Sequence, residues 1–381
     1  MPRTVVLFLS NFQSGGTEWF ALRLARGLIR HNIKPIFLVV RPEGDLLPLI
    51  DKNIEIVSLS GGGNSFPRLL VTLPKLIHFL KERKPDAFLG GLTLLNIIAS
   101  IGIKLSRAPT HFIVIEHMRL MEDPSSLLDK VKKRIKLIFV KYTYKCADTI
   151  VAVSKAAKDD LVNKAGLDPA LPIIIPNPVI PDNFEELAAQ EPPHPWLAGT
   201  PQRPRKRPVI LGIGRLLPNK DFSNLLHAFA NVIKTKDARL IIFGEGEDRE
   251  RLEQTITKLK LSDHAVLAGQ IDNVFSALCA ADLLVLPSRR EAFGNVIVEA
   301  LACGTPVVST DSGGPREILE DGRYGTLAPP SNPKLLAEAI CATFETTPER
   351  EKLIARGKVF DVETSTQAYL KLIDPLKKVC T

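Results

Sequence analysis

Short apolar runs alternate with stretches of helical periodicity along the first half of the chain. TVVLFLS (4–10) and KPIFLVV (34–40) predict strands, and TEWFALRLARGLIRHN (17–32) between them predicts an amphipathic helix. EIVSL, AFLGG, HFIVIEH and TIVAVS extend the series with further strands. Because parallel strands are joined by crossover helices, this alternation predicts a parallel sheet covered by helices.

A second series follows a basic stretch that is rich in proline. EPPHPWLAGTPQRPRKRP, within residues 182–208, is typical of a linker. PVILGIG (208–214) then begins a new alternation, which continues through RLIIFG, AVLAG, LLVLPS and PVVST. We therefore expect an α/β protein with two Rossmann-like, doubly wound domains and a cleft between them. The expected bounds are 1–190 and 205–358, with a C-terminal helix over 359–381.

The composition fits two folded domains in a reducing compartment. The chain has 381 residues, of which 45% are hydrophobic, and this is enough for two cores. Its five cysteines are far apart and include no CxxC pair, so neither a zinc site nor a disulfide framework is expected. The first apolar run predicts a strand rather than a signal peptide, and no run is long enough to span a bilayer. A cytoplasmic location fits best.

The net charge is concentrated in the first half of the chain. Residues 1–190 hold 25 Lys and Arg against 18 Asp and Glu, whereas the remainder holds 25 against 24. Such a basic half suggests an anionic partner, namely a membrane surface, a phosphorylated lipid or nucleic acid. The alternative is a solvated basic surface that has no partner.

One segment combines this charge with an apolar face. KVKKRIKLIFVKYTYK (130–145) contains seven Lys or Arg and no acid. At helical spacing an apolar face is expected, while Leu137 and Val140 would add exposed apolar surface on the basic side. Such a helix is typical of a membrane interface, although a crossover helix that packs on the sheet is also amphipathic. The expected face comprises Leu128, Val131, Ile135, Ile138, Phe139, Tyr142 and Cys146.

Two acids flank a predicted helix start in EAFGNVIVEALACGTPVV (291–308). Glu291 follows the strand LLVLPS, and Glu299 lies about one turn into a helix expected over 295–302, with the Asn295 side chain as its cap. The N–H groups at such an end attract phosphate. Two carboxylates beside an anion site suit a nucleoside-diphosphate sugar, which has hydroxyl-bearing sugars on either side of its phosphates. The alternative is a capping acid and a surface acid.

Two cations follow the first strand of the second series. Arg215 and Lys220 lie in the loop GRLLPNKDF before a helix, where they could neutralise a diphosphate. A surface salt bridge is the alternative. This stretch lacks the third glycine of a dinucleotide fingerprint, because Leu217 stands in its place, and a Rossmann dehydrogenase is therefore disfavoured.

The first half offers two weaker signals, each after a strand. Gly15 and Gly16 in SGGTE would let the backbone approach a ligand closely, although a plain tight turn explains them equally well. His117 follows the strand HFIVIE and is expected on the cleft side, where a structural role is the alternative.

Taken together, these motifs resemble the retaining glycosyltransferases of family 4 over nearly the whole chain. Besides the stretches above, the resemblance includes VAVSKAAKDDL, IPNPV, GEGEDRERLE and FDVETSTQAYLKL. It implies the GT-B fold, with an acceptor-side first domain, a donor-binding second domain and a last helix that returns to the first. Asp221 and Pro178 stand where the family commonly has glycine.

The resemblance also implies a role for each site residue. Glu299 would hold the donor ribose and Glu291 the transferred sugar, while Arg215 and Lys220 would neutralise the leaving diphosphate. Backbone near Gly294 and Asn295 would meet the sugar or the phosphates, and the loop 269–273 would receive the base. In the first domain, Gly15 and Gly16 would approach the phosphates, and His117 would contact the transferred sugar.

The chain contains no Asp-X-Asp motif, so no metal or other cofactor is expected beyond the nucleotide-sugar co-substrate. The expected acceptor is a glycan or lipid-linked precursor at the inner face of the cytoplasmic membrane, and no nucleic-acid partner is expected. Two other functions stay open: a synthase-type glycosyltransferase with a soluble acceptor, and a non-catalytic subunit that binds nucleotide sugars.

Overall fold

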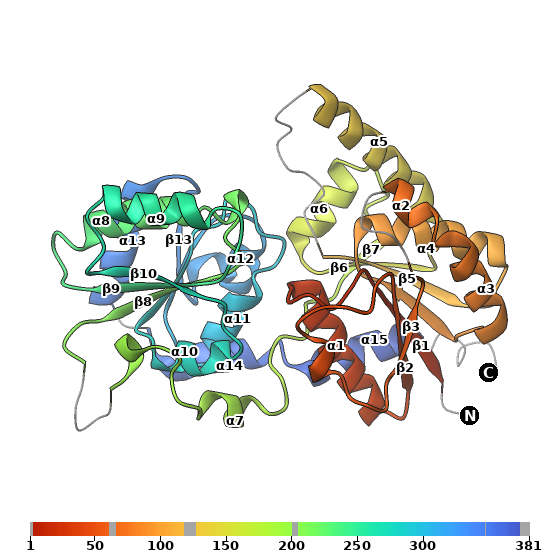
Figure 1. Ribbon diagram of the computed structural model, residues 1–381, viewed down its shortest axis with the longest axis horizontal. Coiled ribbons are helices and arrows are strands. Elements are labelled where there is room, and N and C mark those ends of the chain that lie inside the picture. The colour runs from red at the N-terminus through yellow and green to blue at the C-terminus, as the bar shows by residue number, and fades with distance from the viewer. Residues whose placement is uncertain (1–2, 61–65, 118–126, 200–204, 347, 374–381) are drawn as a thin grey trace. The chain divides into compact units, whose positions relative to one another are not determined.

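The computed structural model describes residues 3–60, 66–117, 127–199, 205–346 and 348–373. The chain divides into two compact units, Met1–Pro178 with Val362–Thr381, and Val179–Asp361. Each unit is a parallel sheet with helices on both faces (Figure 1). The alternation of strands and helices expected from the sequence is therefore confirmed in both halves of the chain.

The first unit contains seven parallel strands in the order β3-β2-β1-β4-β5-β6-β7. The order reverses between β1 and β4, which makes the sheet doubly wound. The strands are β1 (Thr4–Leu9), β2 (Lys34–Val39), β3 (Glu55–Ser58), β4 (Ala87–Gly90), β5 (His111–Glu116), β6 (Thr149–Ala152) and β7 (Pro172–Ile174). The helices are α1 (Gly16–Arg30), α2 (Phe66–Leu70), α3 (Leu73–Arg83), α4 (Thr93–Ser106), α5 (Leu127–Thr143), α6 (Lys155–Asn163) and α15 (Val362–Ile373), with 3-10 turns η1 (Leu47–Leu49) and η2 (Tyr144–Cys146).

The central strands of this sheet are apolar throughout because helices cover both of their faces. In β1, every residue after Thr4 is buried. Phe8 of β1 packs against Phe88 of β4, and Phe88 packs against Phe112 of β5, with ring centroids 5.6 and 6.0 Å apart. These rings join three neighbouring strands, whose C-terminal ends meet at one edge of the sheet.

The second unit contains six parallel strands in the order β10-β9-β8-β11-β12-β13. The strands are β8 (Val209–Ile213), β9 (Arg239–Phe243), β10 (Ala265–Gly269), β11 (Leu283–Leu286), β12 (Val307–Thr310) and β13 (Thr326–Ala328). The helices are α7 (Phe184–Ala188), α8 (Phe222–Val232), α9 (Arg249–Lys258), α10 (Val274–Ala280), α11 (Asn295–Ala302), α12 (Gly314–Ile318), α13 (Pro333–Glu345) and α14 (Arg350–Lys358), with turns η3 (Pro195–Leu197), η4 (Pro218–Lys220) and η5 (Glu320–Gly322).

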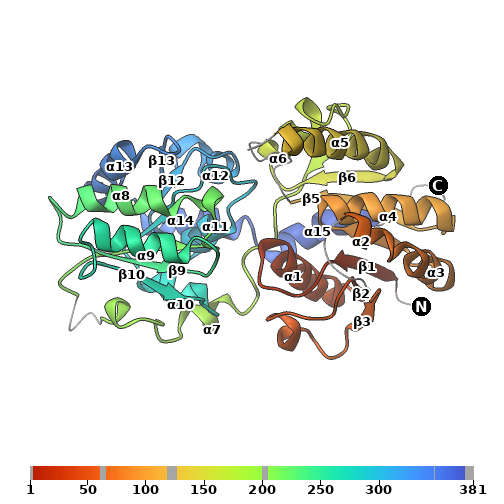
Figure 2. The same cartoon turned by 45° about the horizontal axis from the view of Figure 1, so that its top comes forward.

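Helices cover both faces of the second sheet as well. α8, α9 and α13 lie on one face, and α10, α11 and α14 lie on the other (Figures 1 and 2). The core on the α8 side includes Phe229 and Ile340, both fully buried, from α8 and α13. At the C-terminal ends of β8, β11 and β12, the chain continues in loops before the next helix begins.

The boundary between the units lies at Pro178, before the end of the predicted first domain at residue 190. The backbone N–H of Val179 donates to Phe360 O at 2.9 Å. Phe184 of α7 packs edge-on against Phe275 of α10 at 5.3 Å. Residues 179–190 therefore belong to the second unit, because their hydrogen bonds and ring contacts are with that unit.

Helix α15 packs on α1 within the first unit (Figure 1). A Cβ atom on Gly27 of α1 would lie 2.0 Å from Thr366 Oγ1 of α15, so only glycine allows this approach. Glu363 Oε1 lies 2.8 Å from His31 Nε2, and Tyr369 is fully buried against Phe20. Across the described ranges, every helix is too short or too polar to cross a membrane.

Candidate active site

Three loops at one edge of the second sheet surround the predicted site residues of this unit. β8, β11 and β12 are neighbours in the sheet and run parallel, so the loops after them lie side by side. Arg215 and Lys220 follow β8, and Glu291 follows β11. In open α/β sheets this edge is where ligands bind.

Lys220 and Glu291 form an ion pair across two of these loops. Lys220 Nζ lies 2.5 Å from Glu291 Oε2, and the Ser288 hydroxyl donates to the same oxygen at 3.1 Å. The Lys220 and Glu291 side chains are only 20% and 16% exposed. A ligand that carries both phosphate and hydroxyl groups could separate the pair, since phosphate suits the ammonium and hydroxyls suit the carboxylate.

The loop after β12 fixes the backbone of Glu291. The N–H of Glu291 donates to Ser312 O, and the N–H of Gly314 donates to Glu291 O, each at 3.0 Å. A Cβ atom on Gly314 would lie 2.4 Å from Phe293 O, so this approach requires glycine. The Glu291 side chain therefore starts from a backbone that is held on both sides.

Helix α11 begins as predicted at Asn295, but its cap differs from the prediction. The N-cap residue is Gly294, with φ 109° and ψ 59°, and it makes no side-chain cap hydrogen bond. The prediction that the Asn295 side chain caps this end is wrong, because Asn295 is already the first helical residue. The N-terminal end of a helix attracts anionic ligands through its N–H groups and its dipole.

Glu299 lies in α11 and is only 8% exposed. A carboxylate that is this buried is not an ordinary surface acid, because it needs polar partners in place of water. The alternative of a surface acid at this position is therefore wrong.

Arg215 is exposed, in contrast to Lys220. Its loop packs closely against the turn after β9, where a Cβ atom on Gly244 would lie 1.9 Å from Gly214 O. Leu216 N–H donates to Glu245 O at 2.8 Å. The glycines of GEGEDRE thus allow two loops to meet.

The loop expected to receive the base begins at Gly269, whose backbone has a positive φ of +80°.

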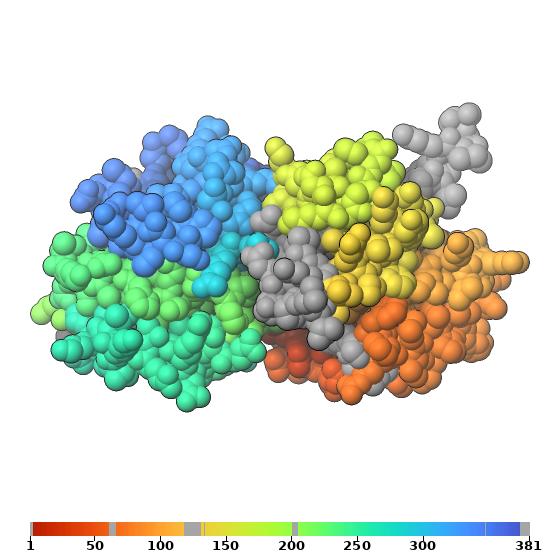
Figure 3. All heavy atoms as spheres, turned by 90° about the horizontal axis from the view of Figure 1, so that it is seen from above, coloured from red at the N-terminus to blue at the C-terminus, as the bar shows by residue number. Residues whose placement is uncertain are grey.

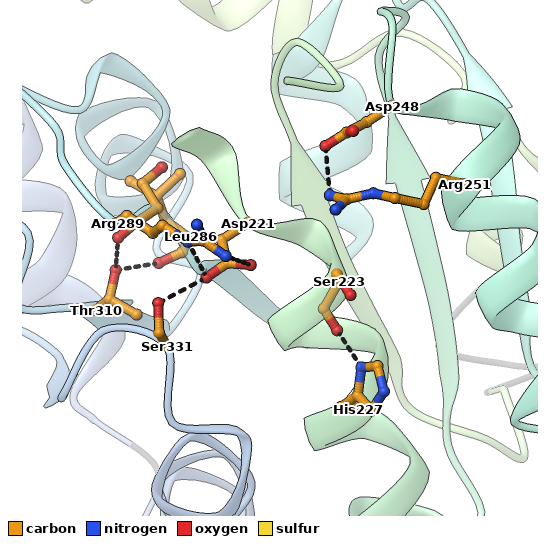
Figure 4. A network of polar contacts seen from close by, with 10 residues as sticks. Asp221, Ser223, His227, Asp248, Arg251, Leu286, Arg289, Thr310 and Ser331 are labelled. Carbon is orange, nitrogen blue, oxygen red and sulfur yellow. Dashed lines mark hydrogen bonds and ion pairs between the residues drawn. The ribbon is translucent and has the colours of Figure 1, made fainter. Parts of the chain in front are cut away.

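Asp221, which stands where the family commonly has glycine, is a buried partner for Arg289. Its backbone is left-handed, with φ 51° and ψ 42°, and it is 3% exposed. Its carboxylate accepts from Arg289 Nε at 2.9 Å and from the Ser331 hydroxyl at 3.0 Å (Figure 4). This ion pair raises the pKa of Arg289. Neither Arg289 nor Ser331 was predicted as a site residue. A signal for Arg289 was present in the sequence, because two arginines directly precede Glu291.

In the first unit, the glycine loop and the histidine lie near each other. Gly15 is the N-cap of α1 with an extended backbone (φ −155°), and Gly16 begins the helix and is exposed. A Cβ atom on Gly91, after β4, would lie 3.0 Å from Thr17 Cγ2 and 3.9 Å from His117 Cδ2. The structure thus brings the start of α1 and His117 to one edge of the first sheet.

His117 is a half-buried, neutral histidine at this edge. Its ring packs edge-on against Phe20, with centroids 4.4 Å apart. Burial lowers the pKa of His117 to about 3, and the nearby Asn177 offsets only part of this effect. Within the described residues, neither ring nitrogen meets a partner at hydrogen-bond geometry. Both ring nitrogens are buried, so the imidazole is held neutral by its surroundings rather than by an ion pair.

Helix α5 has an exposed apolar row rather than a buried one. The row comprises Val131, Ile135, Ile138, Phe139 and Tyr142, which are between 39% and 65% exposed. The side that faces the protein instead includes Val140, which is fully buried. The prediction that Val140 is exposed is wrong, because the helix is rotated so that Val140 meets the core. Leu128 lies in a stretch whose side chains are outside the described ones.

Two families match the sequence, one for each unit. Residues 14–183 match Glycosyltransferase Family 4, and residues 199–360 match Glycosyl transferases group 1. The chain belongs to glycosyltransferase family 4. Among the described residues of this glycosyltransferase, no group of three or more His, Cys, Asp or Glu side chains is placed to hold a metal ion.

Relatives of this glycosyltransferase include two named enzymes that it matches over about half of their length. The lipopolysaccharide core biosynthesis glycosyltransferase LpsE of Rhizobium meliloti (strain 1021) is 35% identical over 45% of this chain and 51% of its own. The N-acetylgalactosamine-N,N'-diacetylbacillosaminyl-diphospho-undecaprenol 4-alpha-N-acetylgalactosaminyltransferase of Campylobacter jejuni subsp. jejuni serotype O:2 (strain ATCC 700819 / NCTC 11168) is 30% identical over 57% of this chain and 58% of its own.

The crystal structure of Anabaena HepE in complex with UDP and glucose has a similar fold. Its TM-score is 0.77 at 22% identity, and the similarity covers 97% of this chain and 99% of that one. The predicted GT-B fold class is thereby confirmed.

Proposed function

We propose that this protein transfers a sugar from a nucleoside-diphosphate sugar to a lipid-linked or other membrane-bound glycan, with retention and without a metal. The observation that carries the proposal is the Lys220–Glu291 ion pair close in sequence to the start of α11. This arrangement offers a cation and the N-terminal end of a helix to phosphate, and a carboxylate to sugar hydroxyls.

Each site residue then has a distinct task. Arg215 and Lys220 stabilise the diphosphate as it leaves, and Glu299 accepts hydrogen bonds from the ribose hydroxyls. Glu291 and His117 orient the transferred sugar, while the backbone at Gly15, Gly16, Gly294 and Asn295 contacts the phosphates or the sugar. The acceptor attacks from the side on which the diphosphate departs, and the leaving phosphate takes the acceptor's proton. The protein contributes positioning and charge stabilisation.

The donor is a nucleotide sugar, and UDP is the first nucleotide to test. The similar Anabaena structure was crystallised with UDP and glucose, and the Campylobacter relative is named for transfer of N-acetylgalactosamine. These names support the class of donor rather than one particular sugar.

A membrane-bound acceptor is supported by the surface of α5. Its exposed apolar row is accompanied by exposed basic residues of the same helix, which include Lys132, Arg134 and Lys141. The described part of this segment, between orange and yellow in colour, lies at the surface in Figure 3. A helix that exposes both kinds of side chain suits the interface of an anionic membrane. The names of the relatives, which mention lipopolysaccharide and diphospho-undecaprenol, point to envelope glycans. We therefore propose peripheral binding to the inner face of the cytoplasmic membrane.

The proposal is tested by donor binding and turnover. A thermal-shift screen of nucleoside diphosphates and their sugars should single out one nucleotide, because ligand binding raises apparent stability. With that donor, Arg215→Ala and Lys220→Ala should each slow donor hydrolysis or transfer by roughly 10–100-fold. Arg207→Ala is the matched control, because Arg207 precedes β8 at the opposite edge and pairs with Asp237.

The same assay separates the proposal from its alternatives. Activity should survive excess EDTA, and NMR of the product should show the anomeric configuration of the donor. Binding without hydrolysis or transfer would favour a non-catalytic subunit. Activity on soluble sugars alone would favour a synthase-type enzyme.

A further inference from the structure

Asp221 and Arg289 form a second charged link between the loops that carry Lys220 and Glu291. Asp221 directly follows Lys220, and Arg289 precedes Glu291 in the loop after β11. Asp221 accepts from Arg289 Nε at 2.9 Å and from Nη2 at 3.4 Å. The backbone N–H of Arg289 also donates to Asn219 O at 2.9 Å. The two loops are therefore joined by two ion pairs and one backbone hydrogen bond.

These two ion pairs differ in what a donor would do to them. Lys220 and Glu291 both have proposed partners on the donor, so donor binding separates them. Asp221 is 3% exposed and also accepts from the Ser331 hydroxyl, whereas the Arg289 side chain is 55% exposed and has no proposed partner on the donor (Figure 4). The Asp221–Arg289 pair is thus the ion pair that still joins the two loops when Lys220 binds the donor phosphates.

We propose that Asp221 and Arg289 are positioning residues that hold the Lys220 loop in place over the donor diphosphate. This inference rests on the proposed function. The left-handed backbone of Asp221 explains how the residue is accommodated, because Asp adopts this conformation more readily than most residues other than glycine. Where the family commonly has glycine, this chain adds a carboxylate that anchors the loop.

The direction in which two substitutions change the affinity for UDP distinguishes a positioning role from a simple effect of net charge. Asp221→Gly removes the carboxylate without straining the backbone, and Arg289→Gln removes the cation. If only net charge near the phosphates mattered, Asp221→Gly would tighten UDP binding and Arg289→Gln would weaken it. If the pair positions Lys220, both substitutions weaken binding, by about ten-fold each.

Calorimetric titration with UDP, or with the nucleotide that the thermal-shift screen selects, measures these affinities well below the melting temperature of each variant. Arg289→Lys should recover part of the affinity lost in Arg289→Gln, because it keeps the charge. Arg207→Gln, at the opposite edge of the sheet, should bind as the unsubstituted protein does. Equal affinity in Asp221→Gly and the unsubstituted protein, or opposite signs for the two substitutions, would overturn the inference.

A double-mutant cycle tests whether the pair acts through Lys220. In the Lys220→Ala background, Asp221→Gly should change UDP affinity by less than about two-fold, since the group it positions is gone. Additive losses would overturn the inference and leave the proposed function standing. A protein that binds no nucleoside diphosphate at all would overturn both.

Discussion

Glu291 and Glu299 belong to the same short motif, yet their surroundings differ. Glu291 is paired with Lys220 and Ser288 in a loop, whereas Glu299 is 8% exposed within α11. His117 differs again, as a neutral ring with no hydrogen-bond partner among the described residues. Burial and ion pairing therefore give these titratable side chains different surroundings, even where the residue type is the same.

The two glutamates should therefore respond differently to substitution. Glu299→Gln is expected to weaken binding of the nucleoside diphosphate alone by about 10-fold or more. Glu291→Gln should leave that affinity unchanged or slightly tighter, because it frees Lys220, and it should impair binding or transfer of the whole sugar donor. Calorimetry with both ligands measures the difference, and equal losses in both variants would contradict it.

His117 should make stability depend on pH. Its pKa is about 3 in the folded protein and near 6.5 when unfolded, so the unfolded chain binds more protons between these values. The stability contribution of neutral His117 is therefore complete above pH 6.5 and falls as the pH drops towards 3, by up to about 1.4 kcal/mol per pH unit. Urea unfolding at pH 7 and 5 should show a larger loss for the unsubstituted protein than for His117→Gln. Parallel curves for the two would contradict this.

Among the elements, the contact between α1 and α15 depends on one glycine. Gly27 lies in the interior of α1, where alanine would normally stabilise a helix. Here the added Cβ would meet Thr366 of α15, whose hydroxyl donates to Val362 O at 2.7 Å. The same helix pair buries Tyr369 against Phe20, and Phe20 in turn contacts His117. The last helix thus supports the histidine through one aromatic ring.

We expect Gly27→Ala to destabilise the protein by about 1–3 kcal/mol through overpacking, against the intrinsic preference of a helix for alanine. Thr366→Ala should restore part of this loss in the double variant. It removes Thr366 Oγ1 and Cγ2, which would lie 2.0 and 3.1 Å from the Cβ atom added at residue 27. Urea unfolding measures both. Stabilisation by Gly27→Ala alone would show that α1 and α15 separate easily.

At the scale of the whole molecule, the exposed row of α5 is the feature on which the proposed membrane binding rests. Five large apolar side chains of this helix are exposed, and most of the net positive charge of the chain lies in its first half. Each basic residue near an anionic membrane contributes about 1 kcal/mol to binding. Apolar side chains that enter the interface would add to this attraction.

Co-sedimentation with vesicles tests this binding. The protein should bind vesicles with anionic lipid more than neutral ones, and high salt should weaken the binding. Ile135→Ser with Ile138→Ser, and separately Lys132→Ser with Lys136→Ser, should each reduce it by at least about 5-fold. Lys258→Ser with Lys260→Ser, on the second unit, is the charge-matched control. Failure of the unsubstituted protein to bind anionic vesicles at low salt would favour a soluble acceptor.

The sequence by itself determined the two sheets, because apolar runs and helical periodicity record which residues must be buried. It also predicted Lys220, Glu291 and Glu299 as site residues. The placement of Lys220 and Glu291 in neighbouring loops follows because residues after adjacent parallel strands share one edge of the sheet. Only the tertiary structure assigned the Gly294 cap, the inward turn of Val140 and the Asp221–Arg289 pair. These depend on local dihedral angles and on contacts between loops distant in the chain, which the pattern along the sequence does not record.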